Sequence, residues 1–197
     1  MKTVNLSLDP LEVSRLWEGD EGADPDDLPG KIAISLSEDH IADFSDDPEW
    51  PLEEQLGSLV GAHLRENFHS SWWEYIRLRQ RRQKRFALLL AHGDVGRDGE
   101  WYFWDGDDSR RVQDWIDEQD GKFACLIVFS CNPGHLNVRS RRSLLVIADR
   151  DVTLCKGPGG YHFSLIDPKH GEIDEYTIEH RLDELRGKES TKKVKKT

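Results

Sequence analysis

The two stretches Phe86-Ala-Leu-Leu-Leu-Ala-His-Gly93 and Ala124-Cys-Leu-Ile-Val-Phe-Ser-Cys131 decide the fold of this chain. Each begins with an apolar run that does not alternate with polar residues, which is typical of a strand covered on both faces. Neighbouring parallel strands bring their carboxyl ends to the same edge of a sheet, where the sites of α/β proteins are built. We therefore predict that His92 and Cys131 lie close together, although 39 positions separate them.

The segment between the two runs predicts a hairpin and then a helix. The aromatic run Trp101–Trp104 lies between two Asp-Gly pairs, and such pairs favour turns. Asp108 or Ser109 can cap the helix that follows, and Gly121 is placed to end it. The expected buried side of this helix is Val112, Trp115 and Ile116. The order strand, helix, strand predicts an α/β fold with a mostly parallel sheet flanked by helices.

Apolar patterns elsewhere predict further strands. A strand is expected at Lys31–Leu36 and another at Ser143–Ala148. The run Tyr161–Ile166 predicts a strand near a sheet edge, and Thr3–Leu8 is a weaker candidate. The chain therefore offers enough strands for one extended sheet.

Three further helices are expected from apolar spacing and capping patterns. Apolar residues between Leu52 and Leu64 recur on one helical face. Ser71, with Glu74 three residues later, matches a capping box at the start of the next helix. The last helix has its apolar face within 178–185 and is expected to stop at Gly187.

Charge divides the 197 residues into three parts: an acidic, loop-rich segment at 1–30, an α/β domain at 31–187 and a basic flexible tail at 188–197. Residues 1–54 hold sixteen Asp and Glu against three Lys and Arg, whereas the last ten residues carry a net charge of +4. The total of −11 argues against nucleic acid as the main partner, since phosphate neutralisation dominates that binding. The clusters Arg77–Arg85 and Lys188–Lys196 are interpreted as solvated surface, with a nucleic-acid role as the weaker alternative. With neither a signal peptide nor an apolar membrane span in the sequence, a cytoplasmic location is expected.

The three cysteines do not form a complete disulfide set and lack the paired spacing of a zinc site. Cys125 lies inside an apolar run and is predicted to be a buried core residue. Cys155 remains ambiguous, whereas Cys131 ends its strand immediately before a turn. Because no histidine and carboxylate cluster has metal-ligand spacing, we expect no metal site. Hydrolysis by a Cys131–His92 dyad needs no cofactor either, so none is expected.

The order of strand, His92-Gly93, hairpin, helix, strand and Phe129-Ser-Cys-Asn-Pro-Gly134 resembles the caspase-like superfamily of cysteine peptidases. This group includes caspases, metacaspases, gingipains, separases and bacterial CHAT domains, and CHAT domains resemble this chain most in motif. The resemblance covers roughly residues 86–148 and implies a caspase-like fold in a compact or divergent version. The second motif departs from the family pattern, because Ser130 precedes Cys131 where alanine is usual and Pro133 replaces threonine or serine.

The resemblance implies a role for each matching residue. Cys131 would be the nucleophile and His92 would shuttle its proton. Independently of the resemblance, His135 lies four residues after Cys131 and is an alternative base. The N–H groups of Gly93 and Cys131 would form the oxyanion hole, and Gly134 would permit the turn after the nucleophile.

The sequence motifs indicate the substrate pocket less clearly than they indicate the Cys131–His92 dyad. Phe129 stands where caspases have a glutamine that lines the pocket for the residue before the cleaved bond. Asp149 and Asp151, which flank Arg150, follow the third buried run and are weak candidates for the same pocket. Acidic lining would select a basic residue and an arginine would select an acidic one, but ordinary surface charge also explains all three.

The sequence therefore predicts a hydrolase, a cysteine endopeptidase that cleaves protein or peptide substrates and is controlled by a regulatory protein partner. Its exposed loop Asn137–Arg142 is a candidate site of proteolytic maturation. The alternative is a catalytically inactive caspase-like module that binds proteins through the acidic amino-terminal segment. Thiol reactivity at Cys131 separates the two interpretations.

Overall fold

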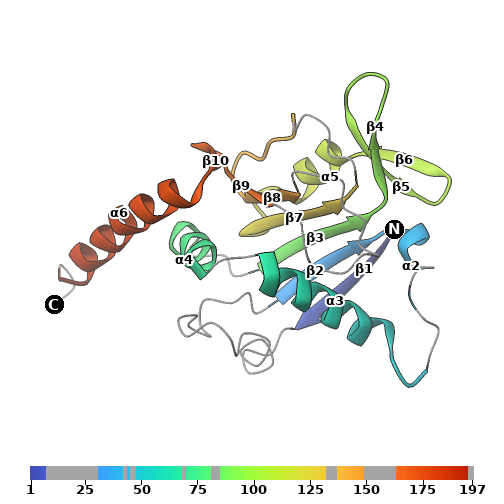
Figure 1. Ribbon diagram of the computed structural model, residues 1–197, viewed down its shortest axis with the longest axis horizontal. Helices are drawn as coiled ribbons and strands as arrows, with labels where there is room; N and C mark the ends of the chain where they lie inside the picture. Colours follow the sequence, from blue (N-terminus) through green and yellow to red (C-terminus); the bar gives the residue numbers. More distant parts are fainter. Residues whose placement is uncertain are drawn as a thin grey trace.

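A seven-stranded mixed sheet forms the centre of the molecule in the computed structural model (Figure 1). The structure describes residues 1–7, 31–41, 44, 48–67, 70–80, 85–131, 137–148 and 163–194. In spatial order the strands are β1 (Lys2–Ser7), β2 (Lys31–Leu36), β3 (Arg85–Ala91), β7 (Cys125–Ser130), β8 (Leu144–Ala148), β9 (Phe163–Asp167) and β10 (Gly171–Ile173). The four from β2 to β8 are parallel, and β1, β9 and β10 each run antiparallel to a neighbour. The predicted α/β class, with a mostly parallel sheet flanked by helices, is confirmed.

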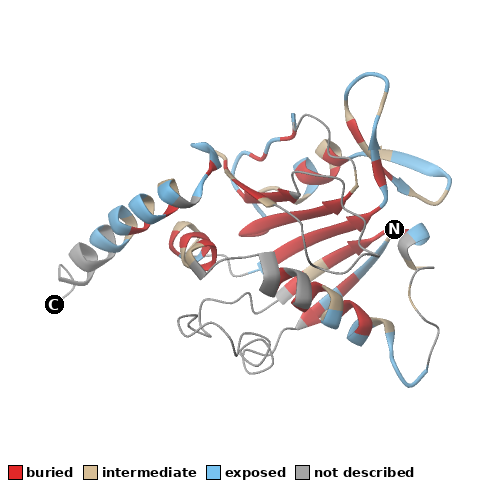
Figure 2. Ribbon diagram, in the orientation of Figure 1, coloured by how far each residue is buried: buried red, intermediate tan, exposed pale blue. Residues whose placement is uncertain are grey.

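Helices cover both faces of this sheet (Figure 1). They are α2 (Glu38–Ile41), α3 (Leu52–Asn67), α4 (Ser70–Arg79), α5 (Val112–Gln119) and α6 (Glu175–Val194). One core cluster joins α3, α4 and α6 to one face, and a second joins α5 to the other. Figure 2 shows the central strands buried between these two layers.

Burial on both faces explains the apolar run in β3. Leu88 and Leu90 belong to the core cluster of α3, α4 and α6, whereas Leu89 and Ala91 belong to that of α5. Because successive side chains of a strand point to opposite faces, every position in such a strand needs an apolar residue. The absence of alternation in this stretch is therefore a direct consequence of its place in the sheet.

A second, three-stranded sheet connects β3 to α5. It consists of β4 (Gly93–Val95), β5 (Trp101–Asp105) and β6 (Asp108–Arg111), in that order. The prediction that Asp108 or Ser109 caps the helix is wrong, since both pair with β5, and α5 starts at Val112 without a side-chain cap. Gly106, with a φ of +67°, permits the tight turn that brings β6 back along β5.

Of the two helix ends predicted at glycines, one is confirmed and the other is wrong. Helix α5 stops at Gln119, and Gly121 adopts a φ of +77° just beyond it, as predicted for a glycine that ends a helix. Helix α6 passes through Gly187 and continues to Val194, so the predicted stop there is wrong. Arg186 Nε donates to Glu74 Oε1 at 2.7 Å and so ties α6 to α4 next to that glycine.

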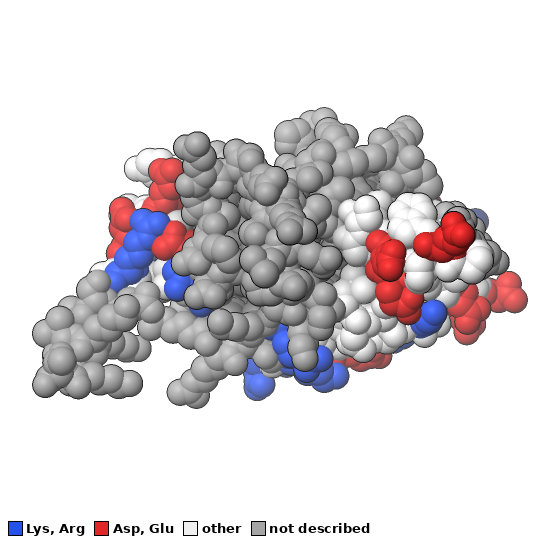
Figure 3. All heavy atoms as spheres, turned by 90° about the horizontal axis from the view of Figure 1, so that it is seen from below, with Lys and Arg blue, Asp and Glu red and all other residues white. Residues whose placement is uncertain are grey.

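Acidic side chains gather at the end of the molecule that carries α2 and the start of α3 (Figure 3). They include Glu38 and Asp39 in the first turn of α2, and Glu53 and Glu54 in that of α3. Within the described residues, no helix has both the length and the apolar composition needed to cross a bilayer. This acidic end is also the one to which the small sheet is attached (Figure 1).

Candidate functional site

The ends of β3 and β7 meet as the sequence predicted. The two strands are parallel neighbours, and their register pairs Ala91 with Ser130. The next residues, His92 and Cys131, therefore leave the same edge of the sheet from strands that lie about 4.8 Å apart. His92 is exposed and Cys131 is half-buried, so solvent reaches both side chains. The register therefore brings an exposed histidine and a partly exposed cysteine to neighbouring positions at one sheet edge.

Strand alternation predicts one face of the sheet for both side chains. Leu90 and Phe129, two positions before His92 and Cys131, belong to the core cluster on the side of α3 and α4. Ala91 belongs to the opposite cluster. If the alternation extends by one residue beyond Ala91 and Ser130, the imidazole and the thiol are expected on the same side. Sharing both an edge and a face is the condition for a Cys–His dyad.

Strand β5 binds both strand ends through hydrogen bonds. The indole Nε1 of Trp101 donates to the Cys131 carbonyl oxygen at 3.1 Å. The backbone N–H of Trp104 donates to the His92 carbonyl oxygen at 3.0 Å. The two residues of the candidate dyad are thus held by one short strand. The aromatic run was predicted to be a hairpin arm, but its sequence carries no signal for this contact.

Gly93 lies in a space that admits no side chain. A Cβ atom at this position would overlap the Ser130 hydroxyl and would lie 2.8 Å from the Tyr102 carbonyl oxygen and 3.2 Å from that of Cys131. The backbone of Gly93 consequently packs directly against the end of β7. A glycine after the histidine is a steric requirement of this site.

The hydrogen-bond pattern of the hairpin sets the direction of the Gly93 amide. His92 and Trp104 form a hydrogen-bonded pair, and such pairs alternate with non-hydrogen-bonded pairs along an antiparallel ladder. Gly93 and Phe103 are therefore a non-hydrogen-bonded pair, in which the backbone groups point away from the partner strand. The Gly93 N–H is directed away from β5, the orientation needed for an oxyanion-hole donor.

The Ser130 hydroxyl is a second feature that the sequence did not single out. Its oxygen is buried and has no hydrogen-bond partner in the described part of the chain. It occupies the space that a Cβ atom on Gly93 would need. The only sequence signal for this role was a serine in place of the alanine that usually precedes the cysteine.

The structure places the remaining candidate residues as follows. Cys125 is fully buried, as predicted, and desolvation raises the pKa of its thiol far above the usual range. Phe129 is 1% exposed and packs edge-on against Phe163, which places its ring in the core and not on a surface open to substrate. The predictions for Gly134, Asp149, Asp151, Cys155 and His135 lie outside the described residues.

The candidate maturation loop is held by hydrogen bonds. Asp120 accepts backbone N–H groups from Arg141, Arg142 and Ser143 at 2.8 to 3.1 Å. The side-chain amide of Gln113 bonds the backbone N–H and the carbonyl oxygen of residue 139. Cleavage here therefore requires that these bonds open first, because a peptidase binds an extended backbone.

The described residues contain no group of three or more His, Cys, Asp or Glu side chains suited to a metal ion. Comparison of the chain with protein-family models, with curated proteins and with solved structures found no significant match.

Trp101→Phe tests the anchoring of Cys131. The variant keeps an aromatic ring but loses the hydrogen bond to the Cys131 carbonyl, which is worth about 1 kcal/mol of folding free energy. We expect alkylation of Cys131 at neutral pH to slow several-fold, because the strand end is less firmly positioned. Alkylation would be followed by mass spectrometry of the native protein.

Trp115→Phe is the matched control for this experiment. Trp115 belongs to the same core cluster as Trp101, but its Nε1 donates at 3.1 Å to the hydroxyl of Ser35 in β2 and not to the end of β7. Its loss should cost comparable stability and leave the alkylation rate unchanged. Equal rates in both variants and the wild type would refute the anchoring role.

Proposed function

We propose that the protein is a caspase-like cysteine endopeptidase, with Cys131 as the nucleophile and His92 as its general base and acid. The observation that carries the proposal is the register of β3 and β7, since pairing of Ala91 with Ser130 brings the two residues to adjacent positions on one sheet edge. The order of His92-Gly93, small sheet, α5 and Cys131 supports the resemblance to this superfamily.

The proposed reaction proceeds through a thioester. His92 takes the Cys131 proton, and the thiolate attacks the peptide carbonyl carbon. The N–H groups of Gly93 and Cys131 donate to the oxygen that becomes negative. The C–N bond then breaks as His92 protonates the leaving amine, which leaves an acyl group on Cys131. His92 deprotonates a water that attacks this thioester, and the acid product leaves as the thiol regains its proton.

Two features of the site favour an active nucleophile over a structural cysteine. Cys131 is half-buried and so open to a substrate, whereas Cys125 in the same strand is fully buried. The second feature is that the Gly93 amide, directed away from β5, is available on the side where β7 ends. A protein or peptide is the substrate class, and a regulatory protein is the expected partner.

The test is alkylation by iodoacetamide between pH 5 and 9, with each cysteine mapped by mass spectrometry. Cys131 should react fastest, and its rate at neutral pH should fall at least about tenfold in His92→Ala, because the imidazole no longer favours the thiolate. Cys125 serves as the unreactive internal reference, since its thiol is buried with a raised pKa.

His170→Ala is the matched control, because His170 is an exposed histidine in the turn between β9 and β10. It should leave the alkylation rate of Cys131 unchanged. If Cys131 reacts no faster than Cys155 and ignores the loss of His92, even with candidate partners added, the catalytic proposal fails. The inactive protein-binding module would then be the function to pursue.

A further inference from the structure

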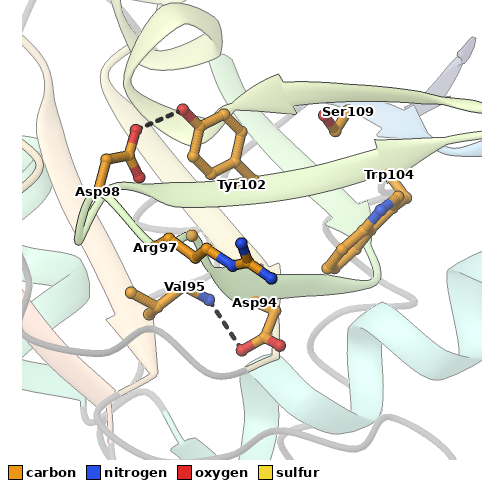
Figure 4. Close-up of a pocket in the computed structure, with 8 residues that line it drawn as sticks. Asp94, Val95, Arg97, Asp98, Tyr102, Trp104 and Ser109 are labelled. Atoms are coloured by element: carbon orange, nitrogen blue, oxygen red, sulfur yellow. Dashed lines mark hydrogen bonds between the residues drawn. The ribbon is translucent and has the colours of Figure 1, made fainter.

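An open hollow of about 560 Å³ lies on the small sheet (Figure 4). Strand β4, strand β5 and the turn between them supply most of its lining. The side chains that determine its chemistry are Asp94, Arg97, Asp98, Tyr102 and Trp104. No part of the proposed mechanism uses this hollow.

The hairpin register places His92 next to the hollow. Asp94 pairs with Tyr102, and the same register continued by two residues pairs His92 with Trp104. Residues two apart on a strand share a face, and directly paired residues have Cβ atoms about 5 Å apart. His92, Asp94, Tyr102 and Trp104 therefore form one continuous surface. A ligand in the hollow would lie beside the candidate base.

The two carboxylates of the hollow differ in the hydrogen bonds that they accept. Asp98 accepts the Tyr102 hydroxyl at 2.8 Å and the Glu100 N–H at 3.1 Å through separate oxygens. The hydrogen bond from Tyr102 accordingly lowers the pKa of Asp98. Asp94 Oδ1 accepts the Val95 N–H at 2.8 Å, while its second oxygen has no partner among the described residues. Asp94 thus carries a fixed negative charge with one oxygen available.

The aromatic wall and the surrounding charge favour a cation over an anion. Trp104 leaves 37% of its surface exposed, and an indole face attracts ammonium and guanidinium groups. The hollow itself contains two carboxylates against one guanidinium. Arg111, which pairs with Tyr102 across the small sheet, is already bound to Asp114 at 2.7 Å. Arg97 is exposed and pairs with no carboxylate in the described part of the chain.

We propose that this hollow binds a basic side chain, lysine or arginine, of a peptide. The cationic head lies at the available oxygen of Asp94, and the methylene chain lies along Trp104. The inference rests on the proposed function in one respect, because it makes the bound residue part of a substrate held beside His92. Arg97 opposes the incoming cation by like charge and so limits the affinity.

The test measures binding by nuclear magnetic resonance on the full chain carrying Cys131→Ala, so that no reaction occurs. The probes are the N-acetyl methylamides of lysine, norleucine and glutamate, which differ in side-chain charge. The lysine probe should bind about tenfold tighter than norleucine, as a charge-assisted contact allows. The shifted resonances should be those of Val95, Trp104 and their neighbours.

Three variants separate the roles of the charges. Asp94→Asn, which keeps an oxygen for the Val95 N–H, should weaken binding of the lysine probe about five- to tenfold. Arg97→Gln should tighten it about two- to fivefold by removing a like charge. Asp107→Asn alters an exposed carboxylate of the same small sheet outside the hollow, and should change the affinity less than about twofold.

The proposal would be overturned in favour of an anion site if the glutamate probe bound more tightly than the lysine probe and the Arg97→Gln variant no longer bound the glutamate probe. Absence of any saturable shift with the lysine probe would overturn it as well. Both results are independent of the alkylation test. If the lysine probe binds and Cys131 proves unreactive in the alkylation test, the binding site is supported and the peptidase is contradicted. If the probe does not bind and Cys131 is reactive, the binding site is contradicted and the peptidase is supported.

Discussion

Replacing Gly93 with alanine should lower the free energy of unfolding by about 3 kcal/mol, the upper range for an added atom in a packed interior. The new Cβ atom would meet the Ser130 hydroxyl and would lie 2.8 Å from the Tyr102 carbonyl oxygen. The hydroxyl can rotate, but the carbonyl belongs to paired strand β5 and moves only with it. Because this shift separates His92 from Cys131, alkylation of Cys131 should also lose its dependence on His92. Urea unfolding and mass-mapped alkylation measure the two effects.

Gly57→Ala is the control for this substitution. Gly57 lies within α3, and a Cβ atom there would meet nothing within 4 Å. Alanine should therefore stabilise the helix by about 0.5 to 1 kcal/mol. The same chemical change should thus have opposite signs at the two positions. Equal effects at Gly93 and Gly57 would contradict the close packing described for the site.

A rescue experiment identifies which contact is responsible. Ser130→Ala removes a buried hydroxyl that has no partner among the described residues, so alone it should be nearly neutral. Combined with Gly93→Ala, it should restore part of the lost stability, since one of the two severe overlaps disappears. The Tyr102 carbonyl remains, so the recovery should be incomplete. Strict additivity of the two changes would show that they do not interact.

The central sheet was predictable because the amino-acid composition of its strands reflects their burial on both faces. A strand covered on both faces must be apolar throughout, and the runs that became β3 and β7 meet that condition. Their adjacency followed from the rule that parallel neighbours end at one edge. The pairing of the two strand ends, Ala91 with Ser130, was therefore accessible from the sequence alone.

The small sheet was only partly predictable because two of its strands lack such a signature. Strand β4 contains Asp94, and β6 is the polar run Asp108-Ser-Arg-Arg111. Both owe their conformation to pairing with the aromatic β5, and such tertiary context outweighs intrinsic preference. The helix cap expected at Asp108 or Ser109 failed for this reason. The hollow beside His92 is built on this sheet and was missed with it.

The contact between α4 and β9 had no local signal either. Asp167, at the end of β9, is fully buried and accepts the Tyr75 hydroxyl and the Arg79 Nε, both at 2.8 Å. Its other oxygen accepts the Lys169 N–H at 2.7 Å. The partners lie about ninety residues apart in the chain, so only the three-dimensional structure brings them together. This network fixes the last antiparallel strands against the helix layer.

Asp167→Asn should lower the free energy of unfolding by about 3 kcal/mol at pH 7, because loss of one partner leaves a partly buried Arg79 uncompensated. The exposed carboxylate Asp107 provides the control, and Asp107→Asn should change stability by less than about 0.5 kcal/mol. The measurement is urea unfolding of both variants and the wild type. A loss no larger than that of the control would mean that the buried network adds nothing to the fold.

The pH dependence of the stability lost in Asp167→Asn tests whether the Asp167 carboxylate is responsible for it. Burial by itself would raise the pKa of Asp167, but hydrogen bonds from Lys169, Arg79 and Tyr75 outweigh it, so the pKa in the folded state is lowered. The carboxylate therefore adds stability above its unfolded pKa of about 3.9, and this is lost as the pH falls through the folded pKa. The difference between wild type and Asp167→Asn should be constant above about pH 5 and shrink below about pH 4.

The alkaline side of the same network should behave in the opposite sense. Burial, followed by the hydrogen bond to Asp167, raises the pKa of Tyr75 to about 12. A raised pKa means that the neutral phenol stabilises the fold below its unfolded value near 10, and that this contribution is lost as the pH rises towards about 12. Tyr75→Phe should remove that alkaline loss and leave the acid dependence of Asp167 in place. The assignment would be contradicted if Tyr75→Phe abolished the loss of stability at acid pH while Asp167→Asn retained it. The Asp167 carboxylate would then not be the group that titrates.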